Sequence, residues 1–154
     1  MAVSDVVDEA LTALDALRIG GQVELSVEVA PDLVVRGDAN ALAQALANLL
    51  ANAWKYTPAE GKRISVRAVG VQAHVTIDVV DNGPGVPVEE SAVIFEKFQR
   101  GSAAAENGAV GTGLGLAVVK AIVSAHQGKV EVRPAASRGA CFRMVLPRPR
   151  LGAA

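Results

Sequence analysis

The chain has little of what marks several classes of protein. Its 154 residues contain one cysteine, so no disulfide can form within the chain. Cys141 lies in the strand-like stretch "ACFRMVLP" and is expected to be a buried, unreactive thiol. The two histidines, His74 and His126, do not stand at a metal-binding spacing with that cysteine. The net charge of −1 implies no broad basic surface, so nucleic acid is not the expected partner.

Long apolar runs are also missing. No stretch reaches the ~18 apolar residues that a membrane-spanning helix needs, and no signal peptide opens the sequence. We therefore expect a soluble domain of a reducing compartment. Aromatic residues make up only 3% of the chain, whereas 51% is hydrophobic, mostly Ala, Val and Leu. That composition favours a packed interior of helices and strands over disorder.

Apolar periodicity predicts the order of helices and strands. Helical stripes predict helices over 6–17, 39–56 and 114–126. Alternating patterns predict strands over 22–29, 62–70, 73–81, 129–134 and 140–147. This order indicates an α+β fold, a two-layer sandwich with helices on one face of a mixed, mostly antiparallel sheet. The length suggests one domain over 1–148, with a loose tail over 149–154.

Local signals refine these predictions. Ser4 or Asp5 is expected to cap the first helix, and Asp38 the second. In the first strand, Val23, Leu25, Val27 and Val29 are expected to face one way. The helix over 114–126 is apolar around much of its circumference and is therefore expected to be buried. Residues 82–112 are too many for an ordinary loop, and such long loops are usually functional or mobile.

The helix over 39–56 carries two stripes. Its apolar stripe is formed by Leu42, Leu46, Leu49, Leu50 and Ala53. A second stripe, about 120° away, holds Asn48, Asn52 and Lys55. Amide oxygens suit Mg²⁺ and its phosphate ligands, and the lysine could meet a phosphate. The alternative is an ordinary solvated helix face.

Two glycine-rich stretches are candidates for ligand contact. In "DNGPGVP" (81–87), Asp81 ends a predicted strand and could accept from an exocyclic amine, while Gly83 and Gly85 allow close backbone approach. The alternative is an ordinary turn. In "GTGLGLAVV" (111–119), three alternating glycines open a helix, whose free N–H groups could bind an anion. The spacing is neither a Rossmann fingerprint nor a P-loop, and the alternative is a hinge before a core helix.

Taken together and in order, these stretches resemble a known family. "NLLANAWKYTP", "DNGPGVP", "IFEKFQRG", "GTGLGLAVVKAIVSAHQGKVEV" and "RGACFRMVLP" are similar to the N, G1, F, G2 and G3 boxes of the sensor histidine kinase catalytic, ATP-binding domain. This is the GHKL, or Bergerat, fold shared with DNA gyrase B and the mismatch-repair ATPases. The sequences "IFEKFQRG" and "GACFR" are similar to those of the KdpD branch.

The resemblance implies roles for individual residues. Asp81 would accept from the adenine amino group, and Asn52 would ligate Mg²⁺, with Asn48 beside it. Residues 88–110 would form a lid over ATP, and its run of small residues, "SAAAENGA", predicts little order without nucleotide. The ATP-binding residues would be Asn48, Asn52, Lys55, Tyr56, Asp81, Gly83, Gly85, Phe95, Lys97, Phe98, Arg100, Gly111, Thr112, Gly113, Leu114, Gly115 and Leu116.

Other positions bear on the chemistry. The gyrase-type ATPases have a glutamate four residues before the metal-binding asparagine, whereas this chain has Asn48, and an amide cannot serve as general base. Weak intrinsic ATP hydrolysis is therefore expected. The third box departs from the family pattern because Gly139 is followed by Ala140 instead of a threonine. His126 is expected to be structural and His74 to lie at the surface, since neither stands in an H-E-x-x-[NT] pattern.

The expected function is therefore that of a protein-histidine kinase fragment that lacks the phosphoacceptor histidine. It would bind Mg-ATP and pass the γ-phosphoryl group to a histidine on a separate dimerisation domain, for relay to a response regulator. The resemblance implies dimerisation and sensor domains upstream, a monomeric fragment of a homodimeric protein, and a cytoplasmic location under an inner-membrane sensor. The alternatives are a non-catalytic nucleotide-binding regulatory module and an anti-sigma-type serine protein kinase.

Overall fold

The computed structural model describes residues 1–15, 24–56, 63–83, 114–134 and 139–149. Three helices and five strands lie in these ranges. The helices are α1 (Val3–Asp15), α2 (Ala39–Tyr56) and α4 (Leu114–Ala125). The strands are β1 (Glu24–Val29), β2 (Arg63–Val71), β3 (His74–Asp81), β4 (Lys129–Pro134) and β5 (Ala140–Pro147).

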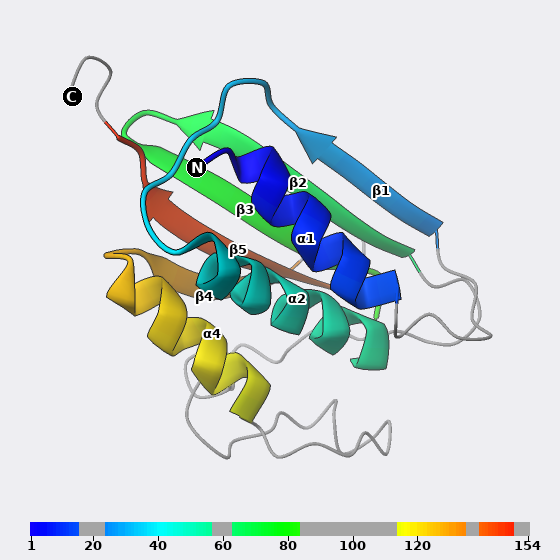
Figure 1. Cartoon of the computed structure of the whole chain (residues 1–154). Coiled ribbons are helices and arrows are strands. Elements are labelled where there is room, and N and C mark those ends of the chain that lie inside the picture. The colour runs from blue at the N-terminus through cyan, green and yellow to red at the C-terminus, as the bar shows by residue number, and fades with distance from the viewer. Residues whose placement is uncertain (16–23, 57–62, 84–113, 135–138, 150–154) are drawn as a thin grey trace.

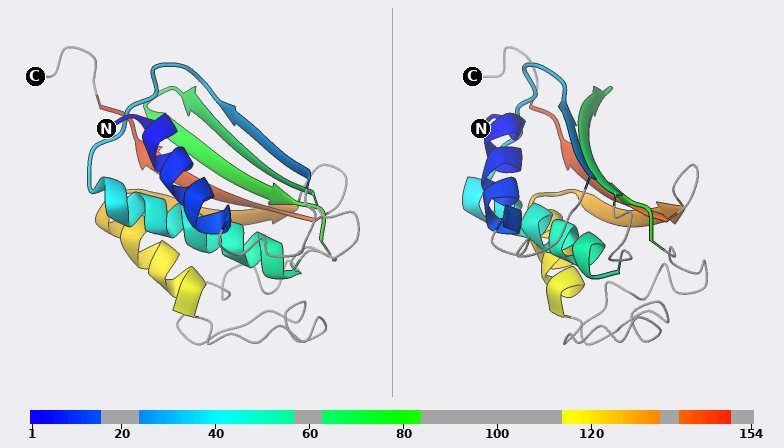
Figure 2. Two further views of the ribbon diagram at one scale, coloured as in Figure 1. Left: turned by 45° about the vertical axis from the view of Figure 1, so that its right-hand side comes forward. Right: turned by 90° about the vertical axis from the view of Figure 1, so that its right-hand side faces the viewer.

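The molecule has two layers. The five strands form one twisted sheet in the order β1-β2-β3-β5-β4, and the three helices all cover the same face of it (Figures 1 and 2). Strands β1 and β2 are parallel, and every other pair is antiparallel. The predicted α+β sandwich is therefore confirmed. None of the helices in the described ranges is both long and apolar enough to cross a membrane.

The core fills the space between the layers. Among the helices, α2 contributes most of the large side chains of this core. The stripe predicted for this helix is buried, with exposed fractions of 0–1% at Leu42, Leu46, Leu49, Leu50 and Ala53. Helix α2 contacts α1 on one side, α4 on the other and strands β2 and β3 beneath. Asp38 caps it as predicted, because its Oδ1 accepts from Ala41 N at 3.1 Å.

The uncovered face of the sheet carries charges in register. Strand pairing places five alternating charges in one row across the sheet: Glu28, Arg67, Asp78, Arg143 and Glu131. Its strongest link is the pair of hydrogen bonds, 2.7 and 2.9 Å long, that the Arg143 guanidinium donates to Asp78.

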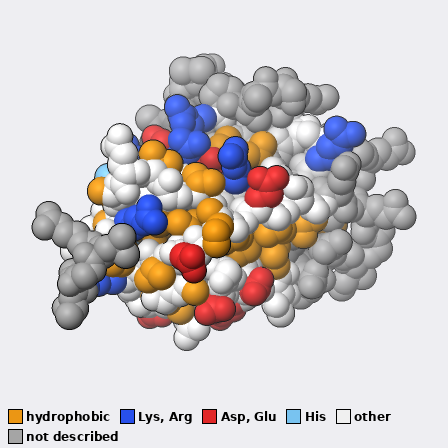
Figure 3. All heavy atoms as spheres, turned by 90° about the horizontal axis from the view of Figure 1, so that it is seen from above, with side chains coloured by type: hydrophobic (Ala, Val, Ile, Leu, Met, Phe, Trp, Pro, Cys, Tyr) orange, Lys and Arg blue, Asp and Glu red, His pale blue; other side chains and the backbone are white. Residues whose placement is uncertain are grey.

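Seen from above, the molecule shows surface hydrophobic groups interrupted by charges of both signs (Figure 3). No single-sign field spans that view.

Helix α1 corrects one prediction. It begins at Val3 instead of residue 6, so Ser4 and Asp5 lie inside its first turn and neither is its cap. The start of the helix is held by backbone pairing instead. Ala2 forms an antiparallel bridge with Val34, and Val3 N donates to Leu33 O at 3.0 Å. A tertiary contact therefore satisfies a donor that sequence reasoning assigned to a side-chain cap.

The burial predicted for α4 was wrong in part, whereas β1 is half-buried as predicted. In β1, Leu25 and Val29 are half-buried, and Val27 is 42% exposed because β1 is an edge strand. In α4, Val119 and Val123 are buried, whereas Lys120 and Ala121 are exposed. This helix lies at the margin of its layer, where it packs on α2 and on the edge strand β4, so one side of it has no described neighbour (Figure 1).

Cys141 yields a test of the packing. It is 8% exposed on β5, and desolvation by burial raises the pKa of its thiol to about 11. At pH 8 only about 0.1% of such a thiol is the reactive thiolate. We expect alkylation by iodoacetamide to be far slower in the folded protein than in 6 M guanidinium, as followed by mass spectrometry. Equal rates in the two states would show that β5 is not packed as described.

Candidate functional site

Strand β3 ends in a buried carboxylate. Asp81 is 6% exposed, and Thr76 is the other buried polar side chain in the described ranges. Asp81 Oδ1 accepts from Gly83 N at 2.9 Å and more weakly from Ala140 N at 3.4 Å. Within the described part of the chain Oδ2 has no hydrogen-bond donor. The carboxylate therefore keeps one oxygen available for an external donor.

Burial governs the protonation of this group. Desolvation raises the pKa of Asp81 above its ordinary value of 3.8, and the backbone hydrogen bonds from Gly83 and Ala140 oppose that rise. No cation of the described ranges is among the causes. A buried acid without such a partner destabilises the fold, and perturbed acids of this kind concentrate at functional sites.

The start of β5 is shaped around Asp81. Gly139 has a φ of 99°, and a Cβ on it would overlap the backbone carbonyl oxygen of Asp81. Only glycine lets β5 begin this close to the strand end. The departure noted in the third box does not affect the backbone contact, since Ala140 uses its N–H. This positioning role of Gly139 was not predicted, although its place directly before a predicted strand was a signal.

Asn82 anchors the turn that follows. Its Oδ1 accepts from Arg63 N at 2.8 Å, and its own N–H donates to Arg63 O at 3.2 Å. The turn after β3 is thereby tied to the first residue of β2. Asn82 was not predicted as a site residue, and its two bonds to the backbone of β2 indicate an architectural role. Gly83, which was predicted, is buried next to it.

The predicted amide face lies on the second half of α2. Asn48 and Asn52 are half-buried and four residues apart, so they share one face of the helix. Leu49 follows Asn48 and Ala53 follows Asn52, and both of these apolar residues are buried and face the core. Lys55 and Tyr56 belong to the last turn of α2.

These segments meet on one side of the molecule. The end of β3 and the end of α2 lie on the same side in both views, and the start of α4 faces that side too (Figures 1 and 2). Leu114 and Gly115 are in the first turn of α4, where backbone N–H groups have no partner within the helix. Leu116 is half-buried against the core.

The remaining predicted residues lie outside the described ranges. These are Gly85, Phe95, Lys97, Phe98, Arg100, Gly111, Thr112 and Gly113.

The described residues offer few ligands for a magnesium ion. In the described ranges no three His, Cys, Asp or Glu side chains gather around a point. The half-buried amides of Asn48 and Asn52 fit a different arrangement. In that arrangement one amide oxygen would ligate Mg²⁺, and phosphate and water oxygens would supply its other ligands, as is common where the ion binds with nucleotides.

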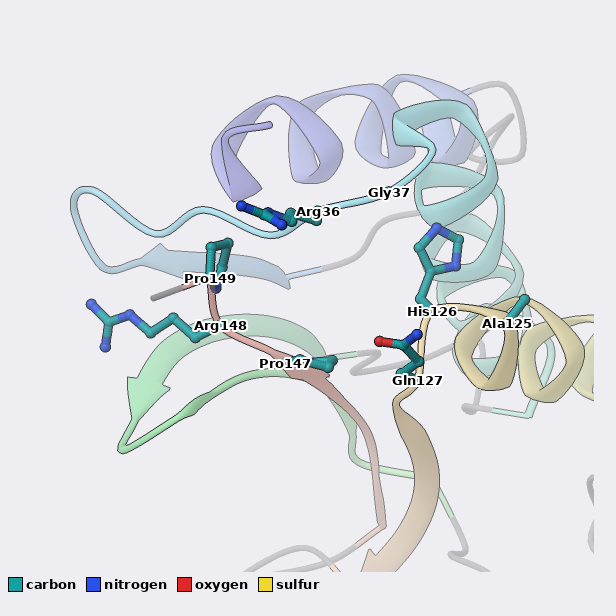
Figure 4. Close-up of a pocket in the computed structure, with 8 residues that line it drawn as sticks. All are labelled: Arg36, Gly37, Ala125, His126, Gln127, Pro147, Arg148 and Pro149. Atoms are coloured by element: carbon teal, nitrogen blue, oxygen red, sulfur yellow. The ribbon is translucent and has the colours of Figure 1, made fainter. Parts of the chain in front are cut away.

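The two histidines occupy other places. His74 is exposed at the start of β3, as predicted. His126 follows the last residue of α4, where its ring hydrogen-bonds to backbone groups of Asp38 and Ile122. A pocket of about 490 Å³ lies beside it, lined by Arg36, Gly37 and Arg148 among others (Figure 4). This pocket is at the end of α4 opposite to the glycine-rich start, so it is distinct from the site around Asp81.

Comparison with known proteins bears on this geometry. Residues 37–150 match the family described as Histidine kinase-, DNA gyrase B-, and HSP90-like ATPase. The chain is 38% identical over 131 residues to the probable sensor histidine kinase TcrY of Mycobacterium tuberculosis. That alignment covers 82% of the chain and 27% of TcrY. It is 36% identical over 153 residues to the sensor protein KdpD of Escherichia coli. That alignment covers 96% of the chain and 16% of KdpD. These identities do not separate a KdpD branch from the mycobacterial kinases.

A solved structure has the same fold. The mycobacterial sensor histidine kinase MprB superposes with a TM-score of 0.82 at 34% identity, over 97% of each chain. The chain thus spans 27% of the length of TcrY and 16% of that of KdpD, but nearly the whole of this MprB structure. The predicted family and fold are confirmed: the chain belongs to the histidine kinase-, gyrase B- and HSP90-like ATPase family and has the fold of a sensor histidine kinase catalytic domain.

Proposed function

We propose that this chain binds Mg-ATP between the end of β3, the amide face of α2 and the start of α4. In the whole protein, the γ-phosphoryl group would pass to a histidine and then to a response regulator. The observation that carries the proposal is the buried Asp81 carboxylate, which has no cationic partner among the described residues and keeps Oδ2 available within that part of the chain. An exocyclic amine of adenine is a donor of the right kind for that oxygen, whereas guanine presents a carbonyl at the equivalent position.

The amide face supplies the second part of the proposal. Asn52 would hold Mg²⁺ through its amide oxygen, with Asn48 one turn earlier on the same face. The bound ion would neutralise phosphate charge, which is the main requirement of phosphoryl transfer. Neither asparagine can act as general base towards water, so we expect slow ATP hydrolysis without an acceptor.

The acceptor histidine belongs elsewhere in this proposal. The chain has two histidines; His74 is exposed on a strand, and His126 is engaged with backbone groups. We propose that residues 1–148 act as one catalytic domain, with 149–154 as a tail, working on a separate dimerisation domain of a homodimeric kinase. A cytoplasmic location under an inner-membrane sensor fits such a protein.

The first test is an ATP titration followed through Trp54, which lies half-buried in α2. We expect saturable binding that prefers ATP over GTP and is strengthened by Mg²⁺. In Asn52→Ala the Mg²⁺ effect should disappear, because the variant lacks the amide oxygen, while Gln44→Ala, exposed on the same helix, should behave as wild type. A chain that binds no ATP at millimolar concentration, or an Asn52 variant with full Mg²⁺ dependence, would contradict the proposal.

Asp81→Asn separates binding from stability. The amide turns a donor toward the adenine amino group, so ATP affinity should fall roughly tenfold to a hundredfold, the range for a hydrogen bond to a charged group. Stability should move the other way at neutral pH, because burial raises the pKa of Asp81 above 3.8 and its charge therefore destabilises the fold.

The sign of the pH dependence follows from that pKa. The folded wild type binds the proton more tightly than the unfolded chain, so its stability falls as pH rises from 3.8 through the raised pKa. The variant lacks this loss. Its melting temperature should exceed that of wild type at pH 7, and the difference should vanish as pH falls below 3.8. A variant less stable than wild type at pH 7 would show that the backbone hydrogen bonds outweigh desolvation.

Gly139→Ala tests the close approach of β5 to Asp81. The added Cβ overlaps the Asp81 carbonyl oxygen at a backbone φ of 99°, so we expect a loss of about 2 kcal/mol or more in the free energy of unfolding. Weaker ATP binding should accompany it, since Asp81 must move. Urea unfolding and the Trp54 titration measure the two effects. Arg133→Ala, exposed on the neighbouring strand, is the control, and a Gly139 variant matching it would contradict the described turn.

A further inference from the structure

The end of α4 is hydrogen-bonded to the start of α2 through one imidazole ring. His126 Nε2 lies 3.0 Å from the backbone N–H of Asp38, and His126 Nδ1 lies 2.8 Å from the carbonyl oxygen of Ile122. Because Asp38 N is a donor, Nε2 must present its lone pair. Nδ1 must then carry the proton and donate it to Ile122. The contact therefore requires a neutral ring in the Nδ1–H form.

The loop before α2 is fitted to this ring. Gly37 has a φ of 139°, and a Cβ on it would overlap the imidazole of His126. Figure 4 shows the ring between the end of α4 and the Gly37 loop. The pocket of about 490 Å³ borders the same ring, so packing on that side does not hold it. Among the described contacts, the two hydrogen bonds and the close approach of the Gly37 backbone fix its position.

Asp38 passes this contact directly to α2. Its carbonyl oxygen accepts from Leu42 N at 3.0 Å, and its Oδ1 accepts from Ala41 N at 3.1 Å. The residue bonded to His126 is therefore the cap from which α2 starts. Any displacement of Asp38 would move the first turn of the helix with it.

The two helices run in opposite senses from this contact. Helix α2 starts there and α4 ends there, and the two pack against each other. Their other ends, with Asn52 on α2 and Leu114 on α4, therefore point toward the proposed nucleotide site (Figure 1). At 1.5 Å per residue, Asn52 is about 20 Å along α2 from Asp38. A small tilt of either helix at the Asp38 contact therefore produces a larger displacement at its other end.

Helix α4 is otherwise held by apolar packing on α2 and β4. From residue 116 to its end, Val119 and Val123 are fully buried, and Leu116 and Ile122 are half-buried against the core. Apolar packing is non-directional, so the hydrogen bond to Asp38 adds a specific position for the end of the helix. We propose that His126 is a positioning residue, whose contact with Asp38 sets α4 relative to α2 and thereby sets nucleotide affinity. This inference rests on the proposed nucleotide site, while the ring contact that underlies it can be tested alone.

The ring itself is the first measurement. The chain has two histidines, so a long-range ¹H–¹⁵N spectrum at about pH 8, where free histidine is neutral, contains two imidazole patterns. His74→Gln removes the exposed one and assigns the other. We expect His126 to show a protonated Nδ1 and an unprotonated Nε2. A ring with its proton on Nε2 cannot accept from Asp38 and would overturn the inference.

A matched pair of variants then tests the consequence. His126→Gln keeps an amide oxygen near the Nε2 position and can still accept from Asp38 N. His126→Asn keeps a short amide near the Nδ1 position, so it can serve Ile122 but cannot reach Asp38. We expect ATP affinity to fall about fivefold in the asparagine variant, as for the loss of one ordinary hydrogen bond, and to stay within about twofold of wild type in the glutamine variant. The backbone amide chemical shifts of Asn48 and Asn52 should likewise change more in the asparagine variant than in the glutamine variant.

Thermal melting of both variants separates positioning from stability. Equal ATP affinity in wild type and His126→Asn would overturn the inference. So would an equal loss of affinity in both variants that follows their melting temperatures, since that is the behaviour of a purely structural residue. If the wild-type chain binds no ATP, the proposed function fails and the role in affinity fails with it; the ring spectrum then decides whether the contact with Asp38 exists.

Discussion

The packing of α2 on the sheet is the constraint on which the other features depend. Its leucine stripe, with Leu42, Leu46, Leu49 and Leu50 exposed by 1% or less, can be buried in only one rotation of the helix. That rotation leaves Asn48 and Asn52 half-buried at the side of the stripe. Hydrophobic burial therefore orients these two polar side chains. Helices α1 and α4 then pack against the flanks of α2.

Asp81 shows the opposite balance. Its burial raises the pKa of the carboxyl group, so the charged form costs stability at neutral pH. The surrounding backbone is arranged to hold it: Gly83 and Ala140 donate to it, and Gly139 gives β5 room to approach. On the uncovered face of the sheet, by contrast, Asp78 has the guanidinium of Arg143 as its partner. Two acids on one strand thus serve different purposes, one as part of a charged row and one as a candidate ligand contact.

Much of the fold could be predicted because its signals are local. The helix over 39–56, its Asp38 cap and the strands predicted over 62–70 and 73–81 follow from periodicity and capping, and the structure confirms them, with the paired strands at 63–71 and 74–81. The errors have tertiary causes. Helix α1 starts at Val3 because Ala2 and Val3 pair with Val34 and Leu33, and α4 is half-exposed because it lies at the margin of its layer. Apolar periodicity tells which side chains can be buried, but not whether a neighbour arrives to cover them.

The sequence by itself determined the elements, the leucine stripe and the ordered motifs that indicate the family, because propensity, capping and side-chain spacing act within a few residues. Only the tertiary structure decided which distant residues meet. It placed Gly139 against Asp81, Asn82 against Arg63 and His126 against Asp38, across sequence separations that no periodicity reports. Those contacts arise from how the sheet and the helices stack. The positions of single polar atoms at the site therefore depend on packing that involves nearly the whole described chain.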